Sequence, residues 1–228
     1  MRILELDPDL APGLDPEARD QATEASDAEL IRLEPGVWKP PTEAEPGHMG
    51  MLVMDGLLSR TLQLANRQSV ELLTQGEILR PWILLGPTSS VRADATFSVL
   101  EPATIAVLDS DFARRVSPWP EIAGALMDRL VLRSRWLAFS LAISHVRRVD
   151  DRLVLLFWHL ADRRGRMTAD GIVIPLKLSH SAIAKLVGAQ RPTVSTALGQ
   201  LRDRGVLERN ANDSWLLRGE PPSARTGE

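Results

Sequence analysis

The 228-residue chain contains no cysteine. This absence excludes disulfides, cysteine-ligated zinc, iron–sulfur clusters and a thiol nucleophile. No stretch of about 18 residues is free of charge, so no membrane-spanning helix is expected. The start, MRILELDPDLAPGLD, is acidic and lacks the basic region and apolar run of a secretory signal. We therefore expect a cytoplasmic protein with no membrane partner.

Lysine is also scarce, because it occurs only at positions 39, 177 and 185, and arginine supplies most of the positive charge. The net charge of −3 hides a division of the chain. Residues 1–144 hold 13 Lys and Arg against 21 Asp and Glu, a net charge of −8, whereas residues 145–218 hold 13 against 7, a net charge of +6. This asymmetry indicates an interaction surface on one half, although uneven solvation of two domains would give the same split.

The first half of the chain is predicted to contain a leader and a β domain. Residues 1–27 are rich in Pro, Asp, Glu and Ala, which disfavours a packed core, so we expect a flexible acidic leader with room for one short helix. Residues 28–117 alternate short apolar runs with turn-forming residues, and MLVMDG at 51–56 ends in the tight-turn pair Asp-Gly. Many short strands predict a β jelly-roll with a sensor-like role.

A long helix is predicted at residues 118–146, where apolar residues recur at helical spacing. Between Leu130 and Ile143 the helix is apolar nearly all round, so it must be buried on more than one side. One side can lie on its own β domain, and a second copy of the same helix is the simplest partner for the other. We expect a homodimer; burial within one large monomer is the alternative.

Residues 147–218 carry the pattern of a winged helix-turn-helix, followed by a disordered tail at 219–228. Ser179 can cap a helix, Gly188 supplies the positive φ of a tight turn, and Pro192 suits the first turn of the next helix. Two short strands are expected around residues 210–213. The order of capping residue, turn glycine, polar outer face and hairpin predicts a DNA-binding domain.

The second helix of this motif, from about Pro192 to Arg204, is predicted to enter the major groove of double-stranded DNA. Arg191 can bond guanine or phosphate. Four further residues of the outer face can reach base edges or phosphates: Thr193, Ser195, Thr196 and Gln200.

The order of β barrel, long apolar helix, hinge and winged helix resembles the cyclic-AMP receptor protein/fumarate–nitrate regulator (Crp/Fnr) family of bacterial transcription factors. The resemblance covers residues 28–217 and is most specific in LSHSAIAKLVGAQRPTVSTALGQLRDRGVLER. It implies an α+β fold and a homodimeric transcription regulator on a palindromic site, with RNA polymerase as a further partner. By resemblance Arg191 reads a base, and the residues that touch phosphates are Ser179, Gln190 and Thr193. Pro192 falls where many members carry a base-reading glutamate, and Thr196 where several carry a second arginine, which implies a different half-site.

The effector site departs from the family pattern. Members that bind cyclic nucleotides carry a glycine-rich cassette with a glutamate for the ribose and an Arg-Ser-Ala-like run for the phosphate. Here GEILRPW is followed by ILLGPTSSVRADA, and Ala93 falls on the phosphate arginine's position. We expect a degenerate cassette that does not bind cyclic AMP in the usual way, and no cofactor. Its residues lie near Gly76, Glu77, Arg80 and Arg92.

Other functions are also weighed on the sequence. His48 in the β half leaves haem open in principle, but a loop histidine is the simpler interpretation, and no metal site is expected. No catalytic motif or paired-carboxylate pattern occurs, so we do not expect an enzyme. The alternatives to an effector-sensing regulator are a cyclic-nucleotide-responsive regulator, a DNA-binding protein without an effector, and a protein-interaction module without specific DNA recognition.

Overall fold

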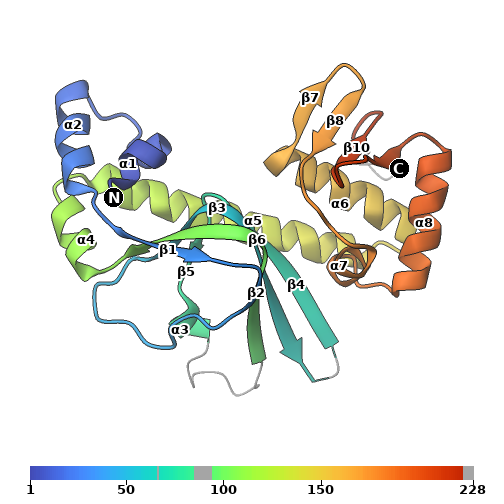
Figure 1. Cartoon of the computed structure of the whole chain (residues 1–228), viewed down its shortest axis with the longest axis horizontal. Helices are drawn as coiled ribbons and strands as arrows, with labels where there is room; N and C mark the ends of the chain where they lie inside the picture. Colours follow the sequence, from blue (N-terminus) through green and yellow to red (C-terminus); the bar gives the residue numbers. More distant parts are fainter. Residues whose placement is uncertain (66, 85–93, 223–228) are drawn as a thin grey trace, which may run out of the picture. The chain divides into compact units, whose positions relative to one another are not determined.

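The computed structural model describes residues 1–65, 67–84 and 94–222 (Figure 1). The chain divides into two compact units, Met1–Trp136 and Leu137–Glu228, and the division falls inside the long helix α5 (Pro120–His145). The first unit combines helices with an antiparallel sheet, and the second contains the helix-turn-helix. The predicted α+β class is confirmed.

The first 27 residues differ from the predicted flexible leader. They form α1 (Ile3–Leu6), the 3₁₀ helix η1 (Pro8–Leu10) and α2 (Pro16–Ala25). The side chains of Ile3, Leu10 and Ala22 are completely buried, in one cluster with apolar residues of α4 (Ser110–Val116) and α5. The prediction failed because it rested on average composition, whereas a few apolar residues at the right positions suffice to bury this segment.

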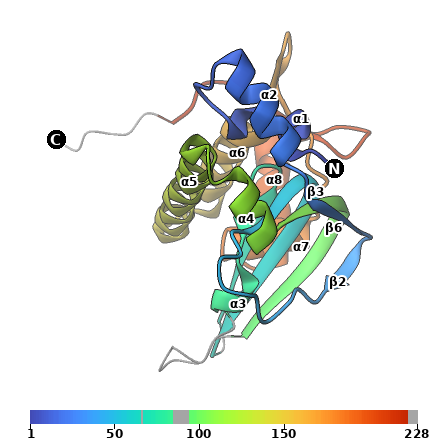
Figure 2. The same cartoon turned by 90° about the vertical axis from the view of Figure 1, so that its left-hand side faces the viewer.

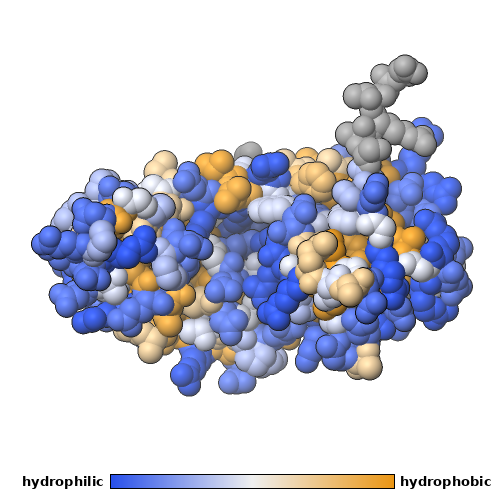
Figure 3. All heavy atoms as spheres, turned by 90° about the horizontal axis from the view of Figure 1, so that it is seen from above, coloured by the Kyte–Doolittle hydropathy of each residue, from blue (hydrophilic) through white to orange (hydrophobic). Residues whose placement is uncertain are grey.

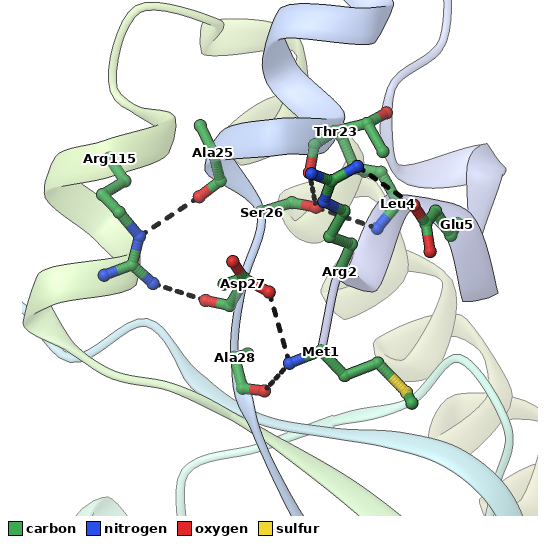
Figure 4. Close-up of polar contacts among 10 residues, drawn as sticks. All are labelled: Met1, Arg2, Leu4, Glu5, Thr23, Ala25, Ser26, Asp27, Ala28 and Arg115. Atoms are coloured by element: carbon green, nitrogen blue, oxygen red, sulfur yellow. Dashed lines mark hydrogen bonds and ion pairs between the residues drawn. The ribbon is translucent and has the colours of Figure 1, made fainter.

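Polar contacts also hold this segment (Figure 4). The Arg115 guanidinium of α4 donates to the carbonyl oxygens of Ala25 and Asp27. Inside the segment, the buried Ser26 hydroxyl accepts from the Leu4 amide at 3.2 Å and donates to the Thr23 carbonyl at 2.7 Å. Figures 1 and 2 both show α2 lying beside α4.

Among the described residues, the sheet of the first unit has six antiparallel strands. They are β1 (Glu29–Leu33), β2 (Gly36–Trp38), β3 (Gly50–Leu64), β4 (Arg67–Thr74), β5 (Ile78–Leu79) and β6 (Asp94–Leu108). Their order is β1-β6-β3-β4, with β2 also on β6 and β5 also on β3. Two long strands, β3 and β6, therefore form the centre of the sheet. A short helix, α3 (Pro81–Leu84), follows β5.

Asp55 and Gly56 do not form the expected tight turn, because both lie within the continuous strand β3. The pairing of β3 with β6 shifts register between Val53 and Leu58, which marks a β-bulge. Gly56 has φ +92°, and a Cβ there would lie 2.3 Å from the Pro102 carbonyl oxygen. The glycine thus serves the bulge and the close approach of β6. Strand β3 instead continues to Leu64, which pairs with Arg67 at the start of β4.

The second unit contains α6 (Val149–Arg164), α7 (His180–Leu186) and α8 (Arg191–Asp203). Its sheet has the order β7-β8-β10-β9, formed by β7 (Arg166–Thr168), β8 (Gly171–Ile174), β9 (Leu207–Arg209) and β10 (Trp215–Leu217). The hairpin β9–β10 with its turn at residues 210–214 is the wing. Buried residues of α6, α7, α8 and the wing form the core: Leu153, Phe157, Ile183, Leu201, Leu207 and Trp215.

Candidate nucleic-acid interface

The local sequence shapes the helix-turn-helix as predicted. The Ser179 hydroxyl caps α7 by accepting from the Ala182 amide at 3.1 Å. Gly188 has φ +64° in the turn, where the Ala189 amide donates to the Ala184 carbonyl at 2.9 Å. Pro192 lies in the first turn of α8, where its missing N–H needs no partner. The turn thereby fixes the start of α8 against α7.

The α8 helix separates a buried face from a polar one. Its buried residues are Val194, Ala197, Leu198 and Leu201. The exposed residues include four of the predicted DNA contacts, namely Arg191, Thr193, Thr196 and Gln200. The Thr196 hydroxyl also donates to the Pro192 carbonyl at 3.2 Å, within the helix. The exposed face of α8 therefore carries both hydrogen-bond donors and hydrogen-bond acceptors, spaced so that they point to the same side of the helix.

Ser195 does not share that face. It is half-buried, and its hydroxyl lies 2.9 Å from Nδ1 of His180, at the start of α7. Ser179 and Gln190, the remaining predicted contacts, are both exposed near the starts of α7 and α8. The structure thus brings six of the seven predicted residues to the surface of the motif and places Ser195 between the two helices.

Helix α6 supports the motif through charged side chains. The Arg152 guanidinium donates to the Val187 carbonyl at 3.1 Å, beside the turn glycine. The nearly buried carboxylate of Asp150 accepts from Arg148 at 2.7 Å and lies 3.7 Å from the Arg204 guanidinium at the end of α8. The hydrogen bond from Arg148 lowers the pKa of Asp150, so the carboxylate stays charged at neutral pH. These contacts tie α6 to the turn between α7 and α8 and to the C-terminal end of α8.

Two surface depressions border α8. One is lined by Arg148 and Asp150 together with the α8 residues Thr193, Thr196 and Gln200. The other lies between three elements, and we call it the cradle: it is lined by Ser179, His180, Ser181, Arg191 and Arg209. Sequence reasoning did not identify His180 or Arg209 as site residues. The position of Arg209 in the wing, directly after the second helix, was the signal that could have drawn attention to it.

The predicted effector cassette is only partly described, because Arg92 lies outside the described residues. Glu77 is buried, and the Gly76 carbonyl accepts from the Arg129 guanidinium of α5 at 3.4 Å. Arg80 is exposed, donates to the His48 carbonyl at 3.2 Å, and lies 5.8 Å from the centre of the Trp82 ring. Arg80 is thus engaged with the segment around His48.

Arg129 also forms a bidentate ion pair with the Asp7 carboxylate, at 2.6 and 2.8 Å. One turn later on α5, Arg133 binds the Glu71 carboxylate at 2.8 and 3.1 Å and the Ile78 carbonyl at 2.8 Å. Together the two arginines fasten α5 to the N-terminal segment and to the β4–β5 region.

The opposite face of α5 is apolar and exposed. Met127 and Val131 are 65% and 66% exposed, and they lie four residues apart on the helix. Further exposed apolar residues of this helix are Leu130, Leu132, Leu137, Phe139 and Leu141. The face drawn in Figure 3 is mostly hydrophilic, with apolar side chains in separate patches. An exposed apolar stripe along one helix is typical of an association surface.

Neither a metal cluster nor a membrane-spanning helix occurs among the described residues. They contain no group of three or more His, Asp or Glu side chains arranged to hold a metal ion. In the same part of the chain, no helix combines the length and apolar character needed to cross a membrane.

Residues 151–218 match the family described as the Crp-like helix-turn-helix domain. The global nitrogen regulator of Synechococcus elongatus is 28% identical over 168 residues, which cover 72% of this chain and 74% of that protein. Among solved structures, a mutant of CooA from Carboxydothermus hydrogenoformans superposes with a TM-score of 0.65 at 21% identity, over 85% of both chains. A cyclic nucleotide-binding domain-containing protein from Listeria monocytogenes gives a TM-score of 0.67 at 15% identity, over 89% of this chain and 92% of that one.

The helix-turn-helix with its wing, joined to a β domain by a long helix, defines a DNA-binding transcription regulator. Residues 151–218 thus carry the Crp-like helix-turn-helix that the resemblance to the Crp/Fnr family predicted, and the chain as a whole is similar to transcription regulators and shares the fold of that family's solved structures. The proteins it is similar to are transcription regulators rather than enzymes.

Proposed function

We propose that the chain acts as a homodimer on a palindromic DNA site. In this arrangement the α8 helices of two copies enter successive major grooves, about 34 Å apart. The observation that carries the proposal is the division of α8 into a buried apolar face and an exposed polar face. A regulator of this kind acts on the bacterial chromosome, so we place it in the cytoplasm, with RNA polymerase as a further partner.

The apolar face of α5 supports the dimer. Arg129 and Arg133 fix one side of the helix to the first unit, whereas Met127 and Val131 lie on the exposed side. If two copies pair these apolar faces, each large side chain that becomes fully buried stabilises the dimer by about 1.5–3 kcal/mol. Sedimentation equilibrium of the full chain tests this: a dimer is expected, and a monomer at micromolar concentration would contradict it.

We assign base contacts to Arg191, Thr196 and Gln200, and phosphate contacts to Ser179, Gln190 and Thr193. Ser195 is left out because its hydroxyl is engaged with His180. Arg191 has the strongest role, since a bidentate arginine–guanine contact contributes about 1–3 kcal/mol of discrimination.

The DNA-binding assignment is tested by selecting an operator from genomic fragments and measuring its affinity for variants. Arg191→Ala is expected to weaken operator binding by about 5- to 150-fold and to reduce preference over random DNA. Arg166→Ala is the matched control, because Arg166 is an exposed arginine on β7 rather than on α8. Equal operator affinity of wild type and Arg191→Ala would refute the base contact.

We further propose that the N-terminal domain does not bind cyclic AMP in the usual way. The support is that Arg129, the cation of α5 beside Gly76, already pairs with the Asp7 carboxylate, so its charge is neutralised within the protein. Isothermal calorimetry with cyclic AMP and cyclic GMP separates this proposal from the nucleotide-responsive alternative. Saturable binding at micromolar nucleotide that tightens operator binding would favour the alternative.

A further inference from the structure

The cradle gathers two arginines and a histidine from three separate elements. Arg191 comes from the start of α8, His180 from the start of α7, and Arg209 from the wing strand β9. The indole ring of buried Trp215 lies beneath two of them: the Arg209 guanidinium lies 5.7 Å from its centre, and the His180 ring lies 6.4 Å from it. Residues far apart in the sequence therefore line one depression, and the buried Trp215 ring beneath them belongs to the core of the second unit.

His180 is held in a defined orientation. Its Nδ1 atom lies 2.9 Å from the Ser195 hydroxyl, so this nitrogen faces the groove between α7 and α8. When the hydroxyl donates to Nδ1, the neutral ring carries its proton on Nε2. Nε2 is then a hydrogen-bond donor that is not used by the Ser195 contact. Ser195 thereby acts as a positioning residue for His180.

The charges around His180 oppose its protonation in the free protein. Burial lowers the pKa of His180 below its usual 6.5, and the positive charges of Arg209 and Arg191 lower it further. Arg209 is itself paired with Asp213 of the wing at 3.0 Å, an exposed contact that leaves it able to reach a second anion. A phosphate bound in the cradle would place a negative charge next to His180 and the two arginines.

We propose that the cradle binds one phosphate of the DNA backbone through Arg209 and His180, beside the base-contacting Arg191, and that His180 takes up a proton as the DNA binds. This inference rests on the proposed function, because it requires that α8 meets DNA. It adds two residues to the interface, assigns Ser195 a positioning role in place of a base contact, and makes operator affinity depend on pH.

The direction of the pH dependence follows from linkage. A bound phosphate stabilises the charged imidazole, so the pKa of His180 is higher in the complex than in the free protein. Affinity then rises as pH falls through the pKa of the complex, and it levels off below the pKa of the free protein. The gain is at most about tenfold per pH unit for each histidine that takes up a proton.

Fluorescence anisotropy with the selected operator, from about pH 8 to about pH 6, tests the proton uptake. Wild type is expected to gain affinity as the pH falls, and His180→Gln to lose most of that gain. His145→Gln is the matched control, since His145 is an exposed histidine of the same unit, and it should keep the gain. An unchanged pH profile in His180→Gln would overturn the inference.

The salt dependence of binding tests Arg209 independently of the histidine. Arg209→Gln should reduce the slope of log affinity against log salt by about 0.9 for each phosphate that the protein no longer neutralises, with unchanged preference for the operator sequence. Arg166→Gln should keep the full slope. An unchanged slope in Arg209→Gln would remove Arg209 from the cradle and overturn the inference.

Ser195→Ala separates a positioning role from base reading. Loss of the pH-dependent gain with the same sequence preference supports the positioning role, whereas an altered base preference would contradict it. The two proposals fail differently. If neither the wild type nor any variant selects a DNA sequence at any pH, the proposed function is wrong. If an operator is selected but its affinity is unchanged in the His180 and Arg209 variants, only the cradle proposal is wrong.

Discussion

The ion pair between Asp7 and Arg129 predicts that the N-terminal segment contributes to the stability of the first unit. The side chains are only 10% and 16% exposed, and the pair has two short hydrogen bonds. Asp7→Asn removes the negative charge and leaves the Arg129 cation with the Gly76 carbonyl at 3.4 Å. Breaking a fully buried pair costs about 3–5 kcal/mol. Since water reaches this pair in part and Asn retains one acceptor, we expect a loss of about 2–3 kcal/mol.

Thermal unfolding of the full chain measures this loss. For a chain of this size about 1 kcal/mol corresponds to about 2–4 °C, so Asp7→Asn should lower the midpoint by about 4–12 °C. Asp9→Asn is the matched control, because Asp9 is exposed in the neighbouring 3₁₀ helix, and its midpoint should stay within about 2 °C of wild type. Equal midpoints for the two variants would refute the reasoning that the segment is part of the folded unit.

Three further predictions concern other parts of the chain. Val131→Glu should convert the proposed dimer into a monomer in sedimentation equilibrium, because it places charge in the apolar stripe of α5; Glu121→Gln, at an exposed position near the helix start, should remain dimeric. Burial lowers the pKa of His159 to about 4, so folded protein should lose stability as pH falls from about 6.5 to about 4; His159→Gln should lose less in urea titrations at these pH values, and an equal loss would contradict the assignment. Gly56→Ala should cost about 2 kcal/mol or more in urea denaturation, since its φ is positive and Cβ meets β6, whereas Gly188→Ala, with open space at its Cβ, should cost about 1 kcal/mol.

The helix-turn-helix was predictable because its signals are local. The cap at Ser179, the turn at Gly188 and the first-turn proline at 192 each act within a few residues, and the structure has each of them in the expected place. The spacing of Val194, Leu198 and Leu201 likewise identified the buried face of α8. These features need no knowledge of what lies across the domain.

The errors came from features that depend on distant residues. The pair Asp55-Gly56 has the local pattern of a tight turn, but the use of Gly56 in a bulge depends on β6, more than 40 residues later in the chain. The N-terminal segment was judged by average composition, although burial depends on where Ile3, Leu10 and Ala22 meet α4 and α5. At these positions the local sequence therefore predicts the backbone conformation. Whether that conformation serves a turn, a bulge or a buried helix depends on the segment that packs against it.

Ser195 is a case at the functional site where the role of a residue also depends on a distant part of the chain. Helical spacing alone assigns it to the polar face of α8, beside Thr196. Its actual surroundings depend on His180, which the turn brings back from fifteen residues earlier in the chain. Because a hydroxyl between two helices cannot also serve a base edge, the outer face offers fewer base-reading groups than the sequence suggests. Under the proposed function, specificity rests chiefly on Arg191, Thr196 and Gln200, and the proposed cradle sets the register of α8 on the DNA backbone.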